Sequence, residues 1–180
     1  MWGKPMGETV TCSLVSRRRV LLGKIAYQKI ELLMKKYKST EWCGYLTGII
    51  DVDDTIYADD LVIPPHLYAL PAYCEPVICH EPVNCVGYIH SHCNMGAFHS
   101  HTDLEYVDRN YPVSIVVANK NGLDFMAVSY RKTECGRYTF QDVPVEFDEA
   151  VFFDEDTFMW EADECIRLGY KKVVTSSKEV

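Results

Sequence analysis

The chain has 180 residues, of which 48% are hydrophobic and 24% charged, and its formal net charge is −8. This composition is typical of a globular protein that buries its core within one domain, so a disordered chain is not expected. No apolar stretch is long enough to span a bilayer, and the acidic balance disfavours nucleic acid as a partner because it repels a phosphate backbone.

The beginning of the chain is a poor signal peptide, because only a few apolar positions separate the basic residues 17–19 from Lys24. We therefore expect a cytoplasmic protein without a membrane anchor. The eight cysteines form an even set that would suit a disulfide framework. Without an export signal, and with cysteines spread through apolar segments, we favour reduced thiols. Cys74, Cys79 and Cys85 contain no C-x-x-C pair, which gives little support to a structural zinc site.

The first half of the chain predicts a helix among strands. Residues 15–22 are expected to form an edge strand, and residues 24–37 an amphipathic helix with apolar side chains at every third or fourth position. A buried strand at 44–50 and a returning strand at 56–63 follow. Residues 64–85 carry five prolines and three cysteines, and we predict an ordered but irregular insertion there.

The second half predicts mostly strands and ends in a helix. In order, we expect a strand at 86–92, a loop at 93–101, a helix at 103–109 capped by Ser100 or Thr102, strands at 113–118 and 123–131 joined by a hairpin turn, a strand at 137–147 that pairs back, and a helix at 154–168. The fold class is mixed, α/β or α+β, with one sheet flanked by helices. Residues 1–150 form the main domain, and the acidic tail 151–180 packs on it or extends it.

The run HSHCNMGAFHSHTD is the main functional signal. On a strand, His90 and His92 project to the same face, and Asp103 arrives from the start of the next helix. Two imidazoles and one carboxylate leave a fourth position for water, which is the pattern of a catalytic zinc rather than a structural one. Taken singly, Asp103 and Ser100 are ordinary helix-capping residues and Glu41 an ordinary residue after a helix. Their joint order and spacing are not ordinary.

These residues resemble the signature of the JAB/MPN family, the JAMM zinc metalloproteases. The chain reads Glu41, then at a distance His90-Ser91-His92, seven residues, Ser100, two residues and Asp103. The resemblance covers roughly residues 20–130 and includes the segments CGYLTG, VGY and YPVSIVVAN. It implies a curved mixed sheet flanked by helices, with the layout of cytidine deaminases.

The resemblance also implies the roles of the site residues. His90, His92 and Asp103 would bind one Zn²⁺ per chain, Glu41 would be the general base that activates the zinc-bound water, and Ser100 would donate a hydrogen bond to the oxyanion. The substrate would be a peptide or isopeptide bond in a protein tail, with a ubiquitin-like modifier as one candidate. Many members carry Pro where this chain has Cys93 and His99, and the stretch CNMGAFHSHTD is similar to the bacterial and phage-associated branch.

Other interpretations stay open at this point. A non-catalytic MPN-type scaffold, or a zinc hydrolase of cell-wall peptides or small molecules, would use the same fold. His99 or His101 could replace a ligand, and Cys93 could act as a thiolate nucleophile beside His92. We expect a substrate tail to lie extended beside a strand near the site, in a groove shaped by the insertion at 64–85.

Overall fold

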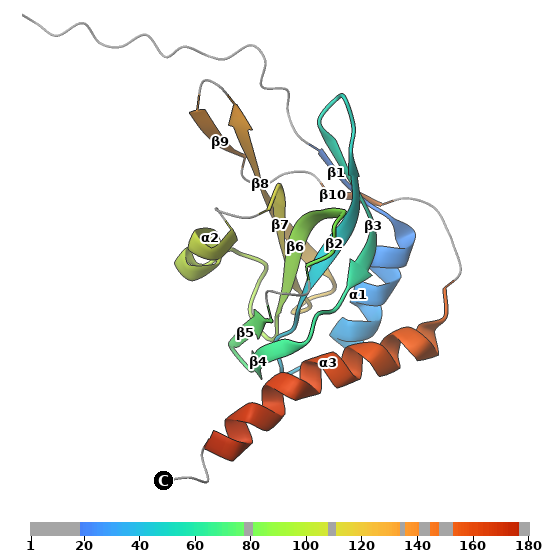
Figure 1. Ribbon diagram of the computed structural model, residues 1–180, viewed down its shortest axis with the longest axis vertical. Coiled ribbons are helices and arrows are strands. Elements are labelled where there is room, and N and C mark those ends of the chain that lie inside the picture. The colour runs from blue at the N-terminus through green and yellow to red at the C-terminus, as the bar shows by residue number, and fades with distance from the viewer. Residues whose placement is uncertain are drawn as a thin grey trace, which may run out of the picture.

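The computed structural model describes residues 19–77, 81–107, 111–133, 136–140, 145–147 and 153–176 (Figure 1). Its elements, in chain order, are β1 (Arg19–Leu22), α1 (Lys24–Lys36), β2 (Cys43–Ile50), β3 (Thr55–Val62), β4 (His66–Leu70), β5 (Tyr73–Pro76), β6 (Cys85–His92), α2 (His101–Val107), β7 (Val113–Ala118), β8 (Asp124–Thr133), β9 (Gly136–Phe140), β10 (Val145–Phe147) and α3 (Glu155–Ser176). Strands and helices thus form the mixed architecture that the sequence predicts.

Eight strands form one curved sheet in the order β10-β1-β3-β2-β6-β7-β8-β9. β1 runs parallel to both of its neighbours and β6 runs parallel to β7, while the other pairs are antiparallel. The sheet is therefore mixed, as expected. β2 and β6 lie at its centre and are buried along most of their length, which suits a site built on rigid strands.

Two expectations about the ends of this sheet were wrong. β1 is not an edge strand, because it lies between β3 and β10; residues 15–18 of the expected strand lie outside the described part. The single strand predicted at 137–147 is two strands, since β9 pairs with β8 and β10 crosses to pair in parallel with β1. β10 has only three residues, too few to show a hydrophobic period.

The prediction of an irregular insertion at 64–85 was also wrong, because this segment contains a β-hairpin. β4 and β5 pair antiparallel, with Ala69 opposite Cys74. The prolines bracket these strands: Pro64 and Pro65 precede β4, Pro71 lies in the turn and Pro76 ends β5. None of them interrupts a strand interior, where proline would remove a ladder hydrogen bond.

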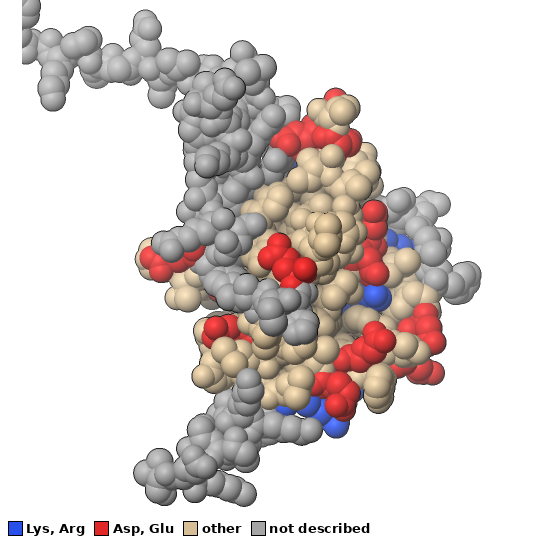
Figure 2. All heavy atoms as spheres, viewed as in Figure 1, with Lys and Arg blue, Asp and Glu red and all other residues tan. Residues whose placement is uncertain are grey.

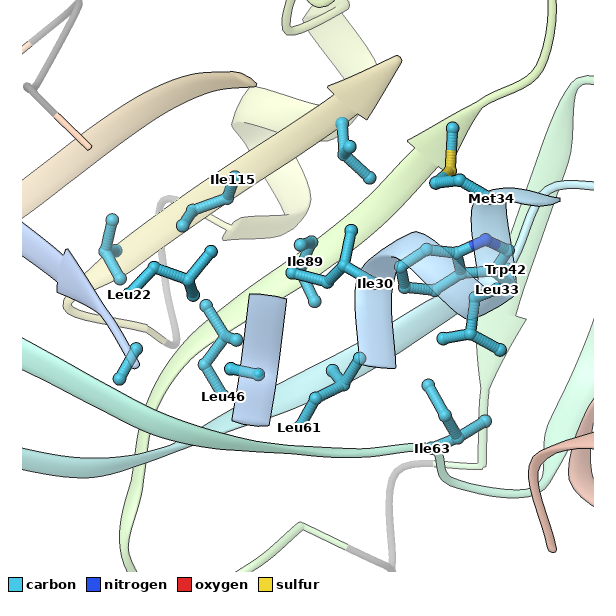
Figure 3. Close-up of a cluster of buried hydrophobic side chains, with 14 of the residues drawn as sticks. Leu22, Ile30, Leu33, Met34, Trp42, Leu46, Leu61, Ile63, Ile89 and Ile115 are labelled. Carbon is cyan, nitrogen blue, oxygen red and sulfur yellow. The ribbon is translucent and has the colours of Figure 1, made fainter. Parts of the chain in front are cut away.

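The main core lies between α1 and one face of the sheet. α1 buries Ala26, Ile30, Leu33 and Met34 at helical spacing, which confirms the predicted amphipathic helix. Figure 3 shows Ile30 beside Ile89 of β6, and both Ile30 and Leu33 beside Trp42, the residue that precedes β2; Leu46 of β2 belongs to the same buried cluster. Burying each such side chain contributes about 1.5–3 kcal/mol, so this layer fixes β2 and β6 relative to each other.

The C-terminal helix covers the hairpin. Asp154 caps α3, since its carboxylate accepts hydrogen bonds from the amide and hydroxyl of Thr157 at 3.0 and 2.8 Å. The helix buries Phe158, Ala162 and Ile166, four residues apart, and packs on β4 (Figure 1). The expected C-terminal helix is therefore present and longer than predicted.

The opposite face of the sheet carries a second, smaller apolar cluster. It consists of Cys43, Tyr45, Tyr88, Tyr111 and Val128, with Cys74, Cys85 and Leu104 packed against it. Figure 2 shows acidic side chains on the turn between β2 and β3 and over α3, with few basic ones on the face in view. No helix in the described ranges is long and apolar enough to cross a membrane.

Candidate metal centre

The two histidines of the H-x-H pair lie side by side at the end of β6. Strand alternation places Tyr88, His90 and His92 on one face. The Nε2 atoms of His90 and His92 are 3.3 Å apart, and each residue is only 4% exposed. The strand is paired on both sides, with β2 and β7, so the two imidazoles project from a fixed backbone.

Asp103 completes the group from the first turn of α2. Its Oδ1 is 3.4 Å from Nε2 of His90, and its Oδ2 is 3.9 Å from Nε2 of His92. Bonds of about 2.0–2.1 Å at tetrahedral angles would separate two ligand atoms by about 3.3–3.4 Å. Within the described residues, these three are the group of His, Cys, Asp or Glu side chains that could hold a metal ion. Two nitrogens and one carboxylate oxygen fit a divalent transition metal with an open fourth position.

Asp103 and Ser100 also cap α2 reciprocally. The amide of Ser100 donates to Oδ2 of Asp103 at 2.7 Å, and the amide of Asp103 donates to Oγ of Ser100 at 3.2 Å. The capping and ligand interpretations of Asp103 are thus compatible. Burial opposes ionisation of this carboxyl, but the hydrogen bonds from His90 and Ser100 outweigh burial and hold its pKa well below the usual range. Asp103 is therefore poised as an anionic ligand.

Glu41 lies just before β2 and faces the same space. Its amide donates to the carbonyl of Leu70 at 2.8 Å, which ties it to the end of β4. The side chain is 4% exposed, and its Oε1 has no hydrogen-bond partner among the described residues. Burial raises the pKa of Glu41 to about 7; His90 lowers it, and Asp103 and Cys43 raise it further. A carboxyl with a pKa near neutrality is suited to taking up and releasing protons.

A cleft of about 360 Å³ brings these groups together. Glu41, His90, His92, Ser100 and Asp103 all line it, so the five predicted site residues converge. One wall is the hairpin strand β5 with Ala72 before it; the other carries Met95, Phe98 and Thr102. Phe98 packs edge-on against the ring of His92, with ring centroids 4.8 Å apart. The cleft is within the size range of ligand sites.

The remaining candidates take other positions. His99 lies outside the ligand group: its Nε2 is 2.9 Å from Oγ of Ser114, and its ring meets that of His90 edge-on at 6.3 Å. Burial, followed by His90, lowers the pKa of His99 to about 4. His101 is exposed and pairs with Glu105 on α2. Burial raises the pKa of Cys93 to about 11, which disfavours a thiolate at that position.

Sequence reasoning did not predict the contact of His66 with β2, nor the hairpin that carries His66. His66 lies in the segment treated as an insertion, yet it is 1% exposed and its Nε2 accepts a hydrogen bond from the amide of Cys43 at 3.0 Å. Its Nδ1 donates to the carbonyl of Pro64 at 2.8 Å, so the hairpin is attached to β2 through this ring. The sequence did contain one signal for the hairpin: the prolines are spaced so that they flank two short strands.

Comparison with known proteins gives information about the fold alone. No protein-family model matches the chain, and no curated protein matches it. The solution structure of protein DSY2949 from Desulfitobacterium hafniense is similar, with a TM-score of 0.51 at 14% identity over 77% of this chain and 97% of that one. At this identity the likeness supports the mixed architecture and carries no statement about activity.

Proposed function

We propose that the protein is a zinc-dependent peptidase or isopeptidase. The observation that carries this proposal is the convergence of His90, His92 and Asp103 with Glu41 in one cleft. Two histidines and one carboxylate are a ligand set of catalytic zinc sites, and structural sites use four protein ligands instead. The fourth group, Glu41, is buried, lacks a hydrogen-bond partner at Oε1 among the described residues, and has a pKa raised toward neutrality.

The protein groups divide the chemistry between them. Bound zinc would supply Lewis acidity, acidifying a water and polarising the scissile carbonyl. Glu41 accepts the proton of the attacking water and returns it to the leaving amine. Ser100 Oγ accepts from the amide of Asp103, so its own O–H is available to donate to the oxyanion that develops on the carbonyl.

The cleft suggests how a substrate lies. β5 pairs with β4 on one side only, and its other side borders the cleft. An extended peptide could therefore add to β5 by backbone hydrogen bonds and present a peptide bond to the metal centre. A protein tail, such as the end of a ubiquitin-like modifier, has the extended form that this geometry accepts.

Metal content and a single substitution test the proposal. The purified protein should contain about one zinc per chain, and Glu41→Gln should keep the zinc while losing peptide hydrolysis. Hydrolysis that is retained in Glu41→Gln would contradict the role of Glu41 as the general base. Absence of metal from protein folded with zinc present would favour a scaffold, and hydrolysis of small amides but no peptide would favour a small-molecule hydrolase.

A further inference from the structure

The loop between β6 and α2, residues 93–100, carries the chain from the histidine pair to Asp103. It ends at Ser100, whose amide donates to the carboxylate of Asp103. Packing gives α2 little support, since the helix has seven residues and its described side chains are exposed or half-buried, with Leu104 packed against the second apolar cluster. The position of Asp103 relative to the histidines therefore depends on how this loop is attached to the sheet.

Among the described residues, two hydrogen bonds attach the loop to the sheet. In the middle of the loop, the carbonyl oxygen of Gly96 is 3.2 Å from Nδ1 of His92. At the end of the loop, Nε2 of His99 is 2.9 Å from Oγ of Ser114. The second bond joins the residue directly before Ser100 to β7, so it restrains the capping residue of α2 more directly than the first bond does.

Ser114 is a fixed point of attachment for this loop. It is fully buried on β7, which is paired with both β6 and β8, and it lies opposite Tyr88 in the parallel register. Side chains at paired positions of neighbouring strands project to the same face, so Ser114 shares the face that carries Tyr88 and His90. A buried hydroxyl group needs a hydrogen-bond partner, and the ring of His99 supplies one.

The two histidines that flank Ser100 have different surroundings. The ring of His99 is bound to Ser114 and meets the ring of His90 edge-on, with ring centroids 6.3 Å apart. His101 is exposed, and its Nε2 is 3.3 Å from Oε1 of Glu105 on the surface of α2. One flank of Ser100 is thus attached to the sheet and the other is not, which makes His101 a matched control for His99.

We propose that His99 is a positioning residue, which holds Ser100, and through Ser100 the ligand Asp103, against the histidine pair by its hydrogen bond to Ser114. The contacts form a continuous series. The ring of His99 is bound to β7, the backbone leads directly to Ser100, and Ser100 and Asp103 cap each other at 2.7 and 3.2 Å. The effect on zinc affinity and on catalysis rests on the proposed function, whereas the attachment of the loop does not.

Hydrogen exchange of the metal-free protein, followed by NMR, tests the attachment of the loop alone. His99→Ala should make the amides of Ser100 and Asp103 exchange about tenfold faster, because local opening then breaks one hydrogen bond fewer. The amide of Ser91, which donates to the carbonyl of Trp42 within the sheet, should be unaffected.

Three further variants separate the hydrogen bond from other effects of the substitution. Ser114→Ala removes the same bond from the other side and should reproduce the faster exchange. His99→Gln keeps a hydrogen-bonding atom at the same number of bonds from the backbone as Nε2 and should restore most of the protection. His101→Ala should change nothing. Exchange at Ser100 and Asp103 that is equal in His99→Ala, Ser114→Ala and the wild type overturns the proposal.

Zinc affinity, measured by competition with a chromophoric chelator, tests whether the effect reaches Asp103. His99→Ala should bind zinc about tenfold more weakly, as is typical when a residue that orients a ligand is lost. In the Asp103→Asn background the same substitution should lower affinity less than about threefold, because effects that act through one group are not additive. A full loss in that background would overturn the route through Asp103. A wild-type chain that binds no zinc contradicts the proposed function, and amide exchange then decides this inference.

The kinetic constants distinguish positioning from general destabilisation. With a hydrolysed peptide in hand, zinc-saturated His99→Ala should lower kcat about ten- to a hundredfold and change KM less than about twofold, because Ser100 and Asp103 act at the reacting centre. His99→Gln should recover most of kcat. A merely structural role would lower the melting temperature and leave kcat and zinc affinity of the folded protein unchanged, and that result overturns the proposal.

Discussion

Trp42 and Ser91 are joined by two hydrogen bonds of opposite direction. The amide of Trp42 donates to Oγ of Ser91 at 3.0 Å, and the amide of Ser91 donates to the carbonyl of Trp42 at 2.9 Å. Trp42 follows Glu41, and Ser91 separates the two ligand histidines. These bonds therefore set the distance between the proposed base and the metal ligands.

Replacing Ser91 by alanine should weaken both stability and activity while leaving metal content unchanged. The change leaves the buried amide of Trp42 without its acceptor, which costs about 1–3 kcal/mol. Urea unfolding measures the loss of stability, and kcat measures the displacement of Glu41. Ser91→Thr keeps the hydroxyl and is the matched control. Equal rates for the alanine variant and the wild type would show that this link does not position Glu41.

Asp103 allows its capping role to be separated from its ligand role. Asp103→Asn keeps an oxygen that accepts from the amide of Ser100, so α2 should stay capped. Asp103→Ala removes that acceptor and should cost about 1 kcal/mol more in unfolding free energy. Both variants lose the anionic ligand, and we expect both to bind zinc at least about tenfold more weakly in a competition titration with a chelator. Wild-type zinc affinity in Asp103→Asn would contradict its assignment as a ligand.

Gly169 marks the point where α3 crosses β4. A Cβ built at this glycine would lie 2.8 Å from the amide nitrogen of Ala69 and the carbonyl carbon of Tyr68, both backbone atoms. Alanine is a better helix former than glycine by about 1 kcal/mol, so in open space Gly169→Ala would stabilise the helix. We expect the opposite, a loss of about 1–3 kcal/mol, because helix and hairpin must separate.

Thermal unfolding checks this prediction, with Gly96→Ala as a control at a position with no heavy atom within 4 Å of the added Cβ. Gly169→Ala should also weaken substrate binding, since β4 pairs with β5, the strand that forms the cleft wall. A stability equal to or above that of the wild type would mean that α3 is free to move away from the hairpin.

The sequence was informative wherever one short segment contains the signal. The pair His90 and His92 follows from strand alternation, and Asp103 arrives one loop later, so the ligand set could be predicted. The amphipathic period of α1 and the apolar runs of β2 and β7 were equally local. Contacts between segments that are distant in sequence could not be predicted, because no local pattern indicates them. Nothing in the three residues of β10 indicates a parallel pairing with β1, and nothing near Cys43 indicates that its amide donates to the ring of His66.

Glu41 should destabilise the protein at neutral pH in the absence of metal. Burial, with smaller contributions from Asp103 and Cys43 and an opposing one from His90, raises its pKa from the model-peptide range to about 7. A carboxyl whose pKa is higher in the folded state binds more protons there than in the unfolded chain. Its contribution to stability is therefore full below the unfolded pKa of about 4.3 and is lost as the pH rises through about 7.

Glu41→Gln removes this titration while keeping a side chain of the same shape. We expect the metal-free variant to match the wild type near pH 4.5 and to exceed it by about 1–3 kcal/mol at pH 8. Urea unfolding of both proteins across this range measures the difference. A difference that does not change with pH would show that Glu41 is solvated in the folded protein. Such a carboxylate would gain little as a base from its surroundings, whereas the expected result means that the fold retains a costly buried carboxyl beside the metal ligands.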